Sequence, residues 1–278
     1  WWCATRRTRR LVGRRPDRSG GAALWIRQTL LNVQADMAAA PEGGLDTVDL
    51  ARLDDVEVSA LAAAARQVRG IEADLAGRGG NVVARLLAEA QEGFYEWDHY
   101  PDGDAYDPAS ESQYFYHAHA ADQRFPGEHG HFHTFVRPYG LTHLLPDGDA
   151  PPRDALTHLI AVSIDTDGRA TRLFTTNRWV TAERWYPAAT TVQLLPTFEM
   201  TGDTPAPEVN GWLTALLRLY RADIAALMTA RDKRLANGGG IVTEGALDDR
   251  TLEVTSLQEI DVPARVRAVE AEAARRAG

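Results

Sequence analysis

Between residues 55 and 76 the apolar side chains recur at intervals of three and four, the spacing of one face of an α-helix. The stripe consists of Leu61, Ala65, Val68, Ile71 and Leu75. Glycines at positions 77, 79 and 80 interrupt the pattern, so the helix is expected to end there. Asn81 is a favourable N-cap for a second helix, whose apolar stripe runs to Trp97 and stops before Pro101.

From about residue 112 the apolar pattern changes to a period of two, which is typical of strands. Strands are predicted over residues 112–119, 129–137, 158–164, 171–177 and 252–260. The third and fourth form a hairpin around residues 165–168, where Gly168 supplies the positive φ that a tight turn needs.

Helical spacing returns in a short segment near residues 181–195 and a long one near 207–236, and the tail from Pro263 is predicted to be helical. Strands joined by hairpins and accompanied by separate helices are typical of an α+β fold. We therefore predict a single α+β domain over residues 37–278, with an antiparallel sheet of four to five strands flanked by helices.

Six of the eight histidines fall between residues 117 and 143, and five of these lie on the first two predicted strands. Alternate residues of a strand point to one face. His117 and His119 therefore share a face, and His129, His131 and His133 share a face of the next strand. If the strands are neighbours, both sets face one side of the sheet, which predicts a metal site or histidine catalysis there.

A metal ion needs ligand nitrogens about 2.0–2.1 Å away, whereas the outer members of an i, i+2, i+4 trio lie about 13 Å apart. We therefore assign His117, His119 and His131 as metal ligands, and His129 or His133 to proton transfer. Glu128 is a further ligand if the chain there is still a loop. Imidazole donors favour a divalent ion such as zinc or iron.

Three polar side chains are candidates for binding a small anionic substrate. Gln113 and Arg137 have the parity of the histidines on the two strands, and Arg178 follows the second hairpin. Guanidinium groups bind carboxylates and phosphates in a bidentate manner. The leading hypothesis is thus a metal-dependent enzyme acting on a small anion. A non-catalytic metal- or ligand-binding protein is an alternative. Rows of histidines also form buried hydrogen-bonded networks that bind no ligand.

Residues 129–135 also resemble the signature of the histidine-triad nucleotide hydrolases and transferases, in which three histidines alternate with apolar residues. That resemblance implies a nucleophilic role for His131 in phosphoryl or nucleotidyl transfer without a metal. Gly130 and Thr134 depart from the pattern, because the family has bulky apolar residues at these positions.

Two longer stretches, Glu-His-Gly-His-Phe-His-Thr-Phe at 128–135 and Phe-Thr-Thr-Asn-Arg-Trp-Val at 174–180, resemble an uncharacterised bacterial family, a domain of unknown function. With the residues around 94–101 and 212–220, the resemblance extends from about residue 50 to 260. It implies one whole domain and transfers no activity.

Composition narrows the class of protein. The chain has a net charge of −9 although residues 1–36 carry eight arginines and two aspartates, so the remainder is strongly acidic and a poor partner for nucleic acid. We predict that residues 1–36 are a disordered or non-native extension before Met37.

No apolar run approaches the roughly 20 residues of a membrane span, so we expect a cytoplasmic protein. With Cys3 as the single cysteine, any metal must use nitrogen and oxygen ligands.

Overall fold

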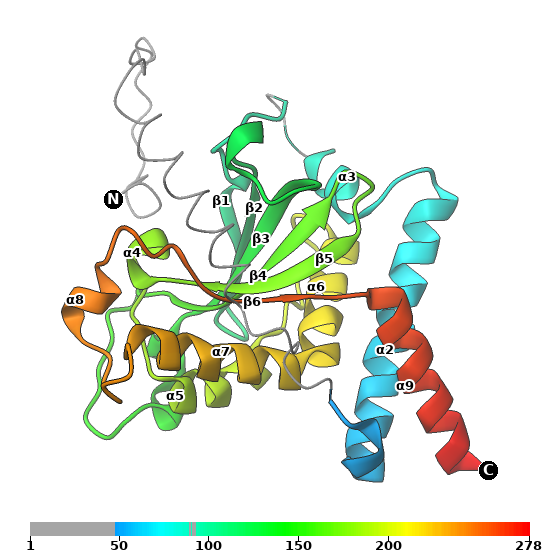
Figure 1. Cartoon of the computed structure of the whole chain (residues 1–278). Coiled ribbons are helices and arrows are strands. Elements are labelled where there is room, and N and C mark those ends of the chain that lie inside the picture. The colour runs from blue at the N-terminus through cyan, green and yellow to red at the C-terminus, as the bar shows by residue number, and fades with distance from the viewer. Residues whose placement is uncertain (1–47, 89, 91–92) are drawn as a thin grey trace.

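The computed structural model describes residues 48–88, 90 and 93–278, so the predicted extension over residues 1–36 lies outside the described residues. At its centre is an antiparallel sheet of six strands, each paired with the next along the chain (Figure 1). The strands are β1 (Tyr100–Asp107), β2 (Ser112–His117), β3 (Glu128–Val136), β4 (Thr157–Asp165), β5 (Ala170–Thr176) and β6 (Val254–Glu259).

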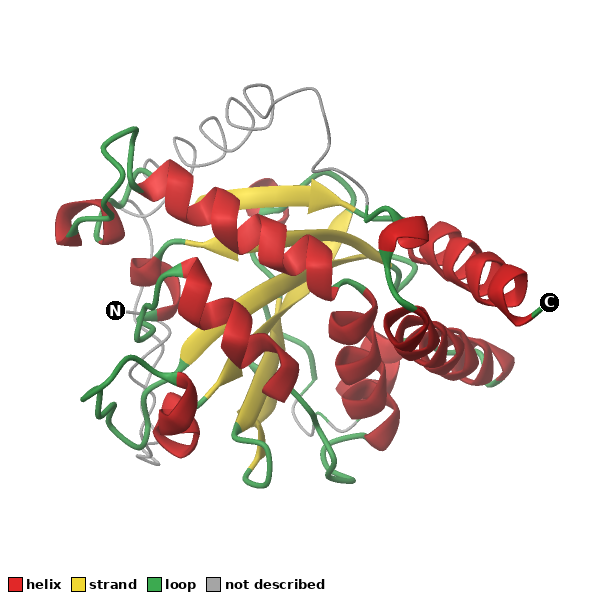
Figure 2. Ribbon diagram, turned by 90° about the horizontal axis from the view of Figure 1, so that it is seen from below, coloured by secondary structure: helices red, strands yellow, loops and turns green. Residues whose placement is uncertain are grey.

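Helices lie over one face of this sheet (Figure 2). The helices of the described residues are α2 (Asp55–Gly77), α3 (Val82–Leu87), α4 (Arg178–Thr181), α5 (Ala188–Leu194), α6 (Pro207–Leu219), α7 (Arg221–Leu235), α8 (Glu244–Leu247) and α9 (Val262–Ala277), and α2 and α9 pack on each other beside the sheet. Short 3-10 turns η1 (Leu50–Arg52), η2 (Ala121–Gln123), η3 (Pro138–Leu144) and η4 (Leu195–Thr197) complete the described segments. Among the helices of these segments, none is long and apolar enough to cross a membrane.

The two faces of the sheet differ in chemistry. On the helix-covered face, Tyr114, Phe132 and Leu173 join one large apolar core with Trp212 of α6. On the opposite face, hereafter the histidine face, the apolar contacts are fewer and centre on Phe125, Ala161 and Phe174. Strands β2 and β3 are nonetheless buried almost throughout, so the polar side chains of the histidine face are enclosed.

The predicted α+β class with an antiparallel sheet is confirmed, but the sheet has six strands rather than four to five. The prediction missed β1, whose pairing with β2 shifts register between Tyr100 and Ala105. Its irregular backbone includes positive φ at Gly103 and Asp104, and its aspartates conceal any alternation. The residues of β1 have little strand preference of their own, and hydrogen bonding to the regular strand β2 makes this segment a strand.

Helix α2 ends where it was predicted to, and Asn81 caps α3 by accepting a hydrogen bond from the Ala84 amide. Helix α3, however, ends at Leu87, and positive φ at Gly93 and Trp97 is incompatible with the predicted continuation. The predicted helix over 207–236 is two helices divided at Tyr220, because α6 packs on α2 whereas α7 packs on β6.

Two β-bulges decide which side chains share the histidine face. Strand β3 advances from Glu128 to Gly130 while its partner β4 advances by one residue, so β3 contains one extra residue at His129. Strand β4 contains its own extra residue, opposite the step from Thr134 to Phe135. Each bulge reverses the alternation of side chains beyond it.

The first bulge depends on glycine at position 130, which gives a prediction for stability. A Cβ atom at this position would overlap the His117 carbonyl oxygen and lie 2.6 Å from the Tyr116 hydroxyl oxygen. We expect Gly130→Ala to lower the free energy of unfolding by about 1–3 kcal/mol, measured by urea denaturation.

The matched control is Gly70→Ala in the exposed part of α2, where an added Cβ has no neighbour within 4 Å. Alanine is favoured over glycine within a helix, so this variant should be as stable as the wild type or more stable by up to about 1 kcal/mol. Equal stability of the Gly130→Ala variant and the wild type would show that the bulge tolerates a side chain.

Candidate metal centre

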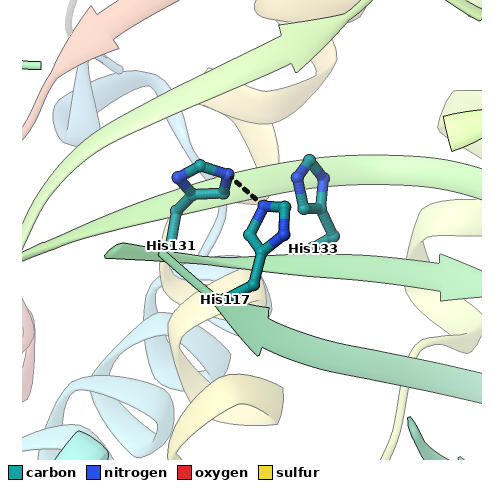
Figure 3. A group of neighbouring side chains, drawn as sticks. All are labelled: His117, His131 and His133. Atoms are coloured by element: carbon teal, nitrogen blue, oxygen red, sulfur yellow. Dashed lines mark hydrogen bonds between the residues drawn. The ribbon is translucent and has the colours of Figure 1, made fainter. Parts of the chain in front are cut away.

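Three buried histidines from two adjacent strands converge on the histidine face. His117 is the last residue of β2, and His131 and His133 lie on β3 directly beside it (Figure 3). The Nε2 atoms of His117 and His131 are 2.7 Å apart. One nitrogen of each of the three rings can be chosen so that all lie within 4.8 Å of one another. We call these residues the histidine trio.

The donor set of the trio fits a transition-metal ion. Four tetrahedral ligands at 2.0–2.1 Å from zinc stand about 3.3 Å from one another. The His117 and His131 nitrogens are 2.7 Å apart, and all three candidate nitrogens lie within 4.8 Å of one another. The ligand spacing of zinc lies between these two distances, so side-chain shifts of about 1 Å would bring the three nitrogens to that spacing. Imidazole nitrogen is a preferred ligand of zinc and iron.

A carboxylate orients one member of the trio. Glu128 Oε1 accepts a hydrogen bond from His131 Nδ1 at 2.8 Å, and Glu128 Oε2 accepts one from the Ser163 hydroxyl at 2.5 Å. The proton on Nδ1 leaves the lone pair of His131 on Nε2, which accepts a hydrogen bond from Nε2 of His117 at 2.7 Å. Ligating histidines in metalloproteins are commonly held by a carboxylate in this way. Glu128 is thus placed to support a ligand rather than to be one.

His133 has its own supporting partner. Its Nδ1 atom lies 3.0 Å from Nε2 of His158 on β4. The bulge in β4 brings His158 to this face, and its backbone amide donates to Glu183 Oε2 at 2.8 Å. Burial raises the pKa of Glu183 to about 7, although the nearby Arg231 opposes the shift. Contact through Nδ1 leaves Nε2 of His133 for a metal.

Burial keeps the imidazoles of His117 and His133 neutral, which is the form that binds metals. It lowers the pKa of His117 and of His133 well below 6.5, and the neighbouring His131 adds to both shifts. The same causes lower the pKa of His119 to about 3, and burial together with Arg231 lowers that of His158 to about 3. His117, His119, His133 and His158 therefore carry unprotonated ring nitrogens near neutral pH.

Two further histidines border the trio. His119 lies beyond the end of β2, with ring centroids 4.9 Å from His117 and 5.1 Å from His131. His99 stacks on Phe115 with centroids 3.7 Å apart, and its Nδ1 atom lies 3.0 Å from Asp104 Oδ1. Of the three predicted ligands, His117 and His131 belong to the trio. His119 lies beside it, and His133 is the third member.

His129 does not share the histidine face, so the predicted parity of this residue is wrong. The bulge turns its side chain toward the helices, where Nδ1 lies 2.5 Å from the Tyr116 hydroxyl and the ring stacks on Phe94. There it lines a cavity of about 200 Å³ between α3 and the β4–β5 turn. Proton transfer at the trio by His129 would have to cross the sheet.

The predicted substrate-binding residues lie away from the trio. Gln113 and Arg137 do contact each other, since the Arg137 guanidinium donates to Gln113 Oε1 at 2.7 Å. Gln113 in turn donates to Asp104, which connects this pair to His99. Arg178 on α4 is paired with Glu244 and Asp248. No contact therefore brings Arg178 together with Gln113 and Arg137 within the described part of the chain.

The sequence interpretation missed the supporting residues His158, Ser163 and Glu253. His158 and Ser163 are on a predicted strand, but their contacts with β3 follow from pairing and from a bulge that no local signal marks. Glu253 precedes β6, and burial raises the pKa of its carboxyl while the proximity of His131 opposes the shift. Only the approach of β6 beside β5 brings this carboxyl near the trio.

Comparison with known proteins places the chain in a family. The family described as "Domain of unknown function (DUF6969)" matches residues 62–260, which include the whole sheet, and the chain belongs to this family. The resemblance to a domain of unknown function is thereby confirmed. No curated protein and no solved structure matches the chain.

The buried neutral histidines predict a pH dependence of stability for metal-free protein. Their pKa values are lower in the folded than in the unfolded state, near 6.5, so unfolding takes up protons below that pH. Stability should be constant above about pH 6.5 in this respect and fall toward pH 3, by up to about 1.4 kcal/mol per pH unit for each histidine.

The measurement is urea denaturation of chelator-treated protein between pH 4 and 7.5. His158→Gln should reduce the slope by about one histidine's contribution, because burial depresses the pKa of His158 only in the folded state. His143→Gln is the control, since His143 is exposed on η3. Parallel curves for His158→Gln and the wild type would contradict the prediction.

Proposed function

We propose that this protein is a metal-dependent enzyme whose divalent ion is bound by His117, His131 and His133. The observation that supports the proposal is the convergence of three buried imidazoles, with candidate nitrogens within 4.8 Å of one another, on one face of the sheet. Two of them are oriented by further polar groups, Glu128 and His158. Partners of this kind also orient metal-ligating histidines in proteins of known structure.

Three protein ligands favour catalysis over a structural role. Structural zinc sites have four protein ligands, whereas catalytic sites have three and keep one position for water or substrate. When bound, such an ion polarises a substrate oxygen or lowers the pKa of a bound water. His119 and Glu253 are further titratable groups beside the trio. Zinc and iron are the proposed ions because all three donors are imidazole nitrogens.

A small-molecule substrate with an anionic group is part of the proposal, and Arg137 is the residue that supports it. Its guanidinium stacks over the Tyr106 ring at 3.8 Å and donates to Gln113. Four residues separate Arg137 from His133, which corresponds to about 13 Å along a strand. A substrate that contacts both the metal and Arg137 would therefore be extended.

A second candidate function is metal-independent phosphoryl or nucleotidyl transfer through His131. The Glu128–His131 pair favours it, since a carboxylate on Nδ1 increases the nucleophilicity of Nε2. However, Nε2 of His131 faces His117, and His129 points to the other side of the sheet. The two candidates differ in metal content, because the first needs an ion bound by the trio and the second needs none.

The direct test is the metal content of purified, untagged full-length protein, measured by elemental mass spectrometry before and after reconstitution with Zn²⁺ or Fe²⁺. We expect about one ion per chain in the wild type and loss of that ion in His131→Ala, because two remaining imidazoles cannot hold it. His143→Ala should retain the ion. A wild type that binds no metal, or a His131→Ala variant that keeps it, would refute the proposal.

The supporting role of Glu128 gives a further prediction. Glu128→Gln should weaken zinc affinity about 10- to 100-fold while leaving one ion per chain at saturation, because the carboxylate fixes the His131 ring without binding the ion. Competition with a chelating indicator measures the change. Glu199→Gln, at an exposed carboxylate that pairs with Arg218, is the control and should bind zinc as the wild type does. Complete loss of zinc in Glu128→Gln would instead identify Glu128 as a ligand.

A further inference from the structure

His119 lies beside the histidine trio without being part of it. Strand β2 ends at His117, so His119 is two residues beyond the last paired position and is less constrained by the sheet. Its ring centroid is 4.9 Å from that of His117 and 5.1 Å from that of His131, as close as the trio members are to one another. His119 thus places a fourth imidazole ring beside the trio.

Trp97 stacks on the His119 ring, which also forms a hydrogen bond with the Gln123 backbone. The two rings are stacked, with centroids 4.4 Å apart and planes inclined by 18°. The Trp97 amide donates to the Ala118 carbonyl oxygen at 2.8 Å, which joins this segment to the residue before His119. The indole remains 38% exposed, so it covers the imidazole rather than filling the core.

The backbone of Trp97 is in a conformation that costs free energy. Its φ is 71°, in the left-handed region that favours glycine and that bulky residues rarely occupy. Strained residues of this kind persist where surrounding contacts enforce them, and they concentrate at functional sites. Trp97 keeps this unfavourable backbone conformation although its ring is partly exposed. We take this as an indication that the ring is needed where it stacks on His119.

A second contact fixes the backbone of His119. The Arg124 guanidinium donates through Nε to the His119 carbonyl oxygen and pairs through Nη2 with Glu96 Oε1 at 2.7 Å. Glu96 thus acts on the main chain of His119 through Arg124, and Trp97 contacts its side chain directly. Both the main chain and the ring of His119 are thus fixed beside the trio.

We infer that Trp97 is a positioning residue that stacks on His119 and thereby keeps a fourth imidazole from closing the metal site. The inference rests on the proposed function. With His119 stacked on Trp97, the ion has three protein ligands and an open position for a small anion or a water. With His119 turned inward, four imidazoles would occupy the ion and the site would resemble a closed structural one.

The test uses the full-length protein loaded with Co²⁺, whose visible spectrum reports the number and geometry of its ligands, and azide as the probe of the open position. In Trp97→Ala the stacking energy is lost, so His119 should enter the coordination sphere and change the spectrum. The apparent azide affinity should fall about two- to tenfold, the factor that an aromatic stacking energy represents. Trp97→Phe retains a flat ring and should restore both the spectrum and the affinity to within about twofold.

The double variant Trp97→Ala/His119→Ala separates this role from general damage to the fold. It should bind azide as tightly as His119→Ala alone, because no fourth imidazole is present to compete. A Trp97→Ala variant with the wild-type spectrum and azide affinity would overturn the inference alone, as would an altered spectrum that persists in the double variant relative to His119→Ala. A wild type that binds no Co²⁺ would overturn the proposed function and this inference together.

Discussion

The pairing of β3 with β4, including its two bulges, is the constraint on which the rest of the site depends. An extra residue at His129 turns this histidine toward the helices and brings Glu128 onto the face of His131. An extra residue in β4 places His158 beside His133. Without these steps, strict alternation would separate His131 from Glu128 and His133 from His158.

The sheet itself helps to shield the histidine face from solvent. Helices cover the opposite face, and the buried central strands leave the histidine face enclosed with few apolar partners. Enclosed imidazoles are neutral because protonation would bury a charge without solvation, as the depressed pKa values of His117 and His133 express. The same desolvation that disfavours a proton leaves free lone pairs for a metal ion, whose charge several ligands share.

Buried polar groups normally have partners, and the surroundings of the trio follow this rule in an ordered way. Glu128 is shared between His131 and Ser163, and His158 connects His133 to the segment that contains Glu183. On the outer side, Trp97 and Arg124 hold His119. The arrangement thus consists of the histidine trio, the polar partners of two of its members, and a covering layer formed by Trp97 and Arg124.

The sequence by itself determined the elements with strong local signals. The apolar stripe of α2, the N-cap at Asn81, the positive-φ turn at Gly168 and five of the six strands follow from periodicity and turn chemistry. It also located the histidine-rich strands, because alternation at spacing two requires no tertiary information. Strand β1 escaped prediction because its pairing partner, rather than its own residues, makes it a strand.

Tertiary structure alone decided the membership of the site. Parity counting assumes an uninterrupted strand, so it assigned His129 to the wrong face and could not bring His158 to the right one. The separation of α6 from α7 at Tyr220 likewise follows from packing on two different elements. A bulge costs little locally and depends on the neighbouring strand, so it leaves no periodic trace in the sequence, yet it reverses the direction of every side chain beyond it.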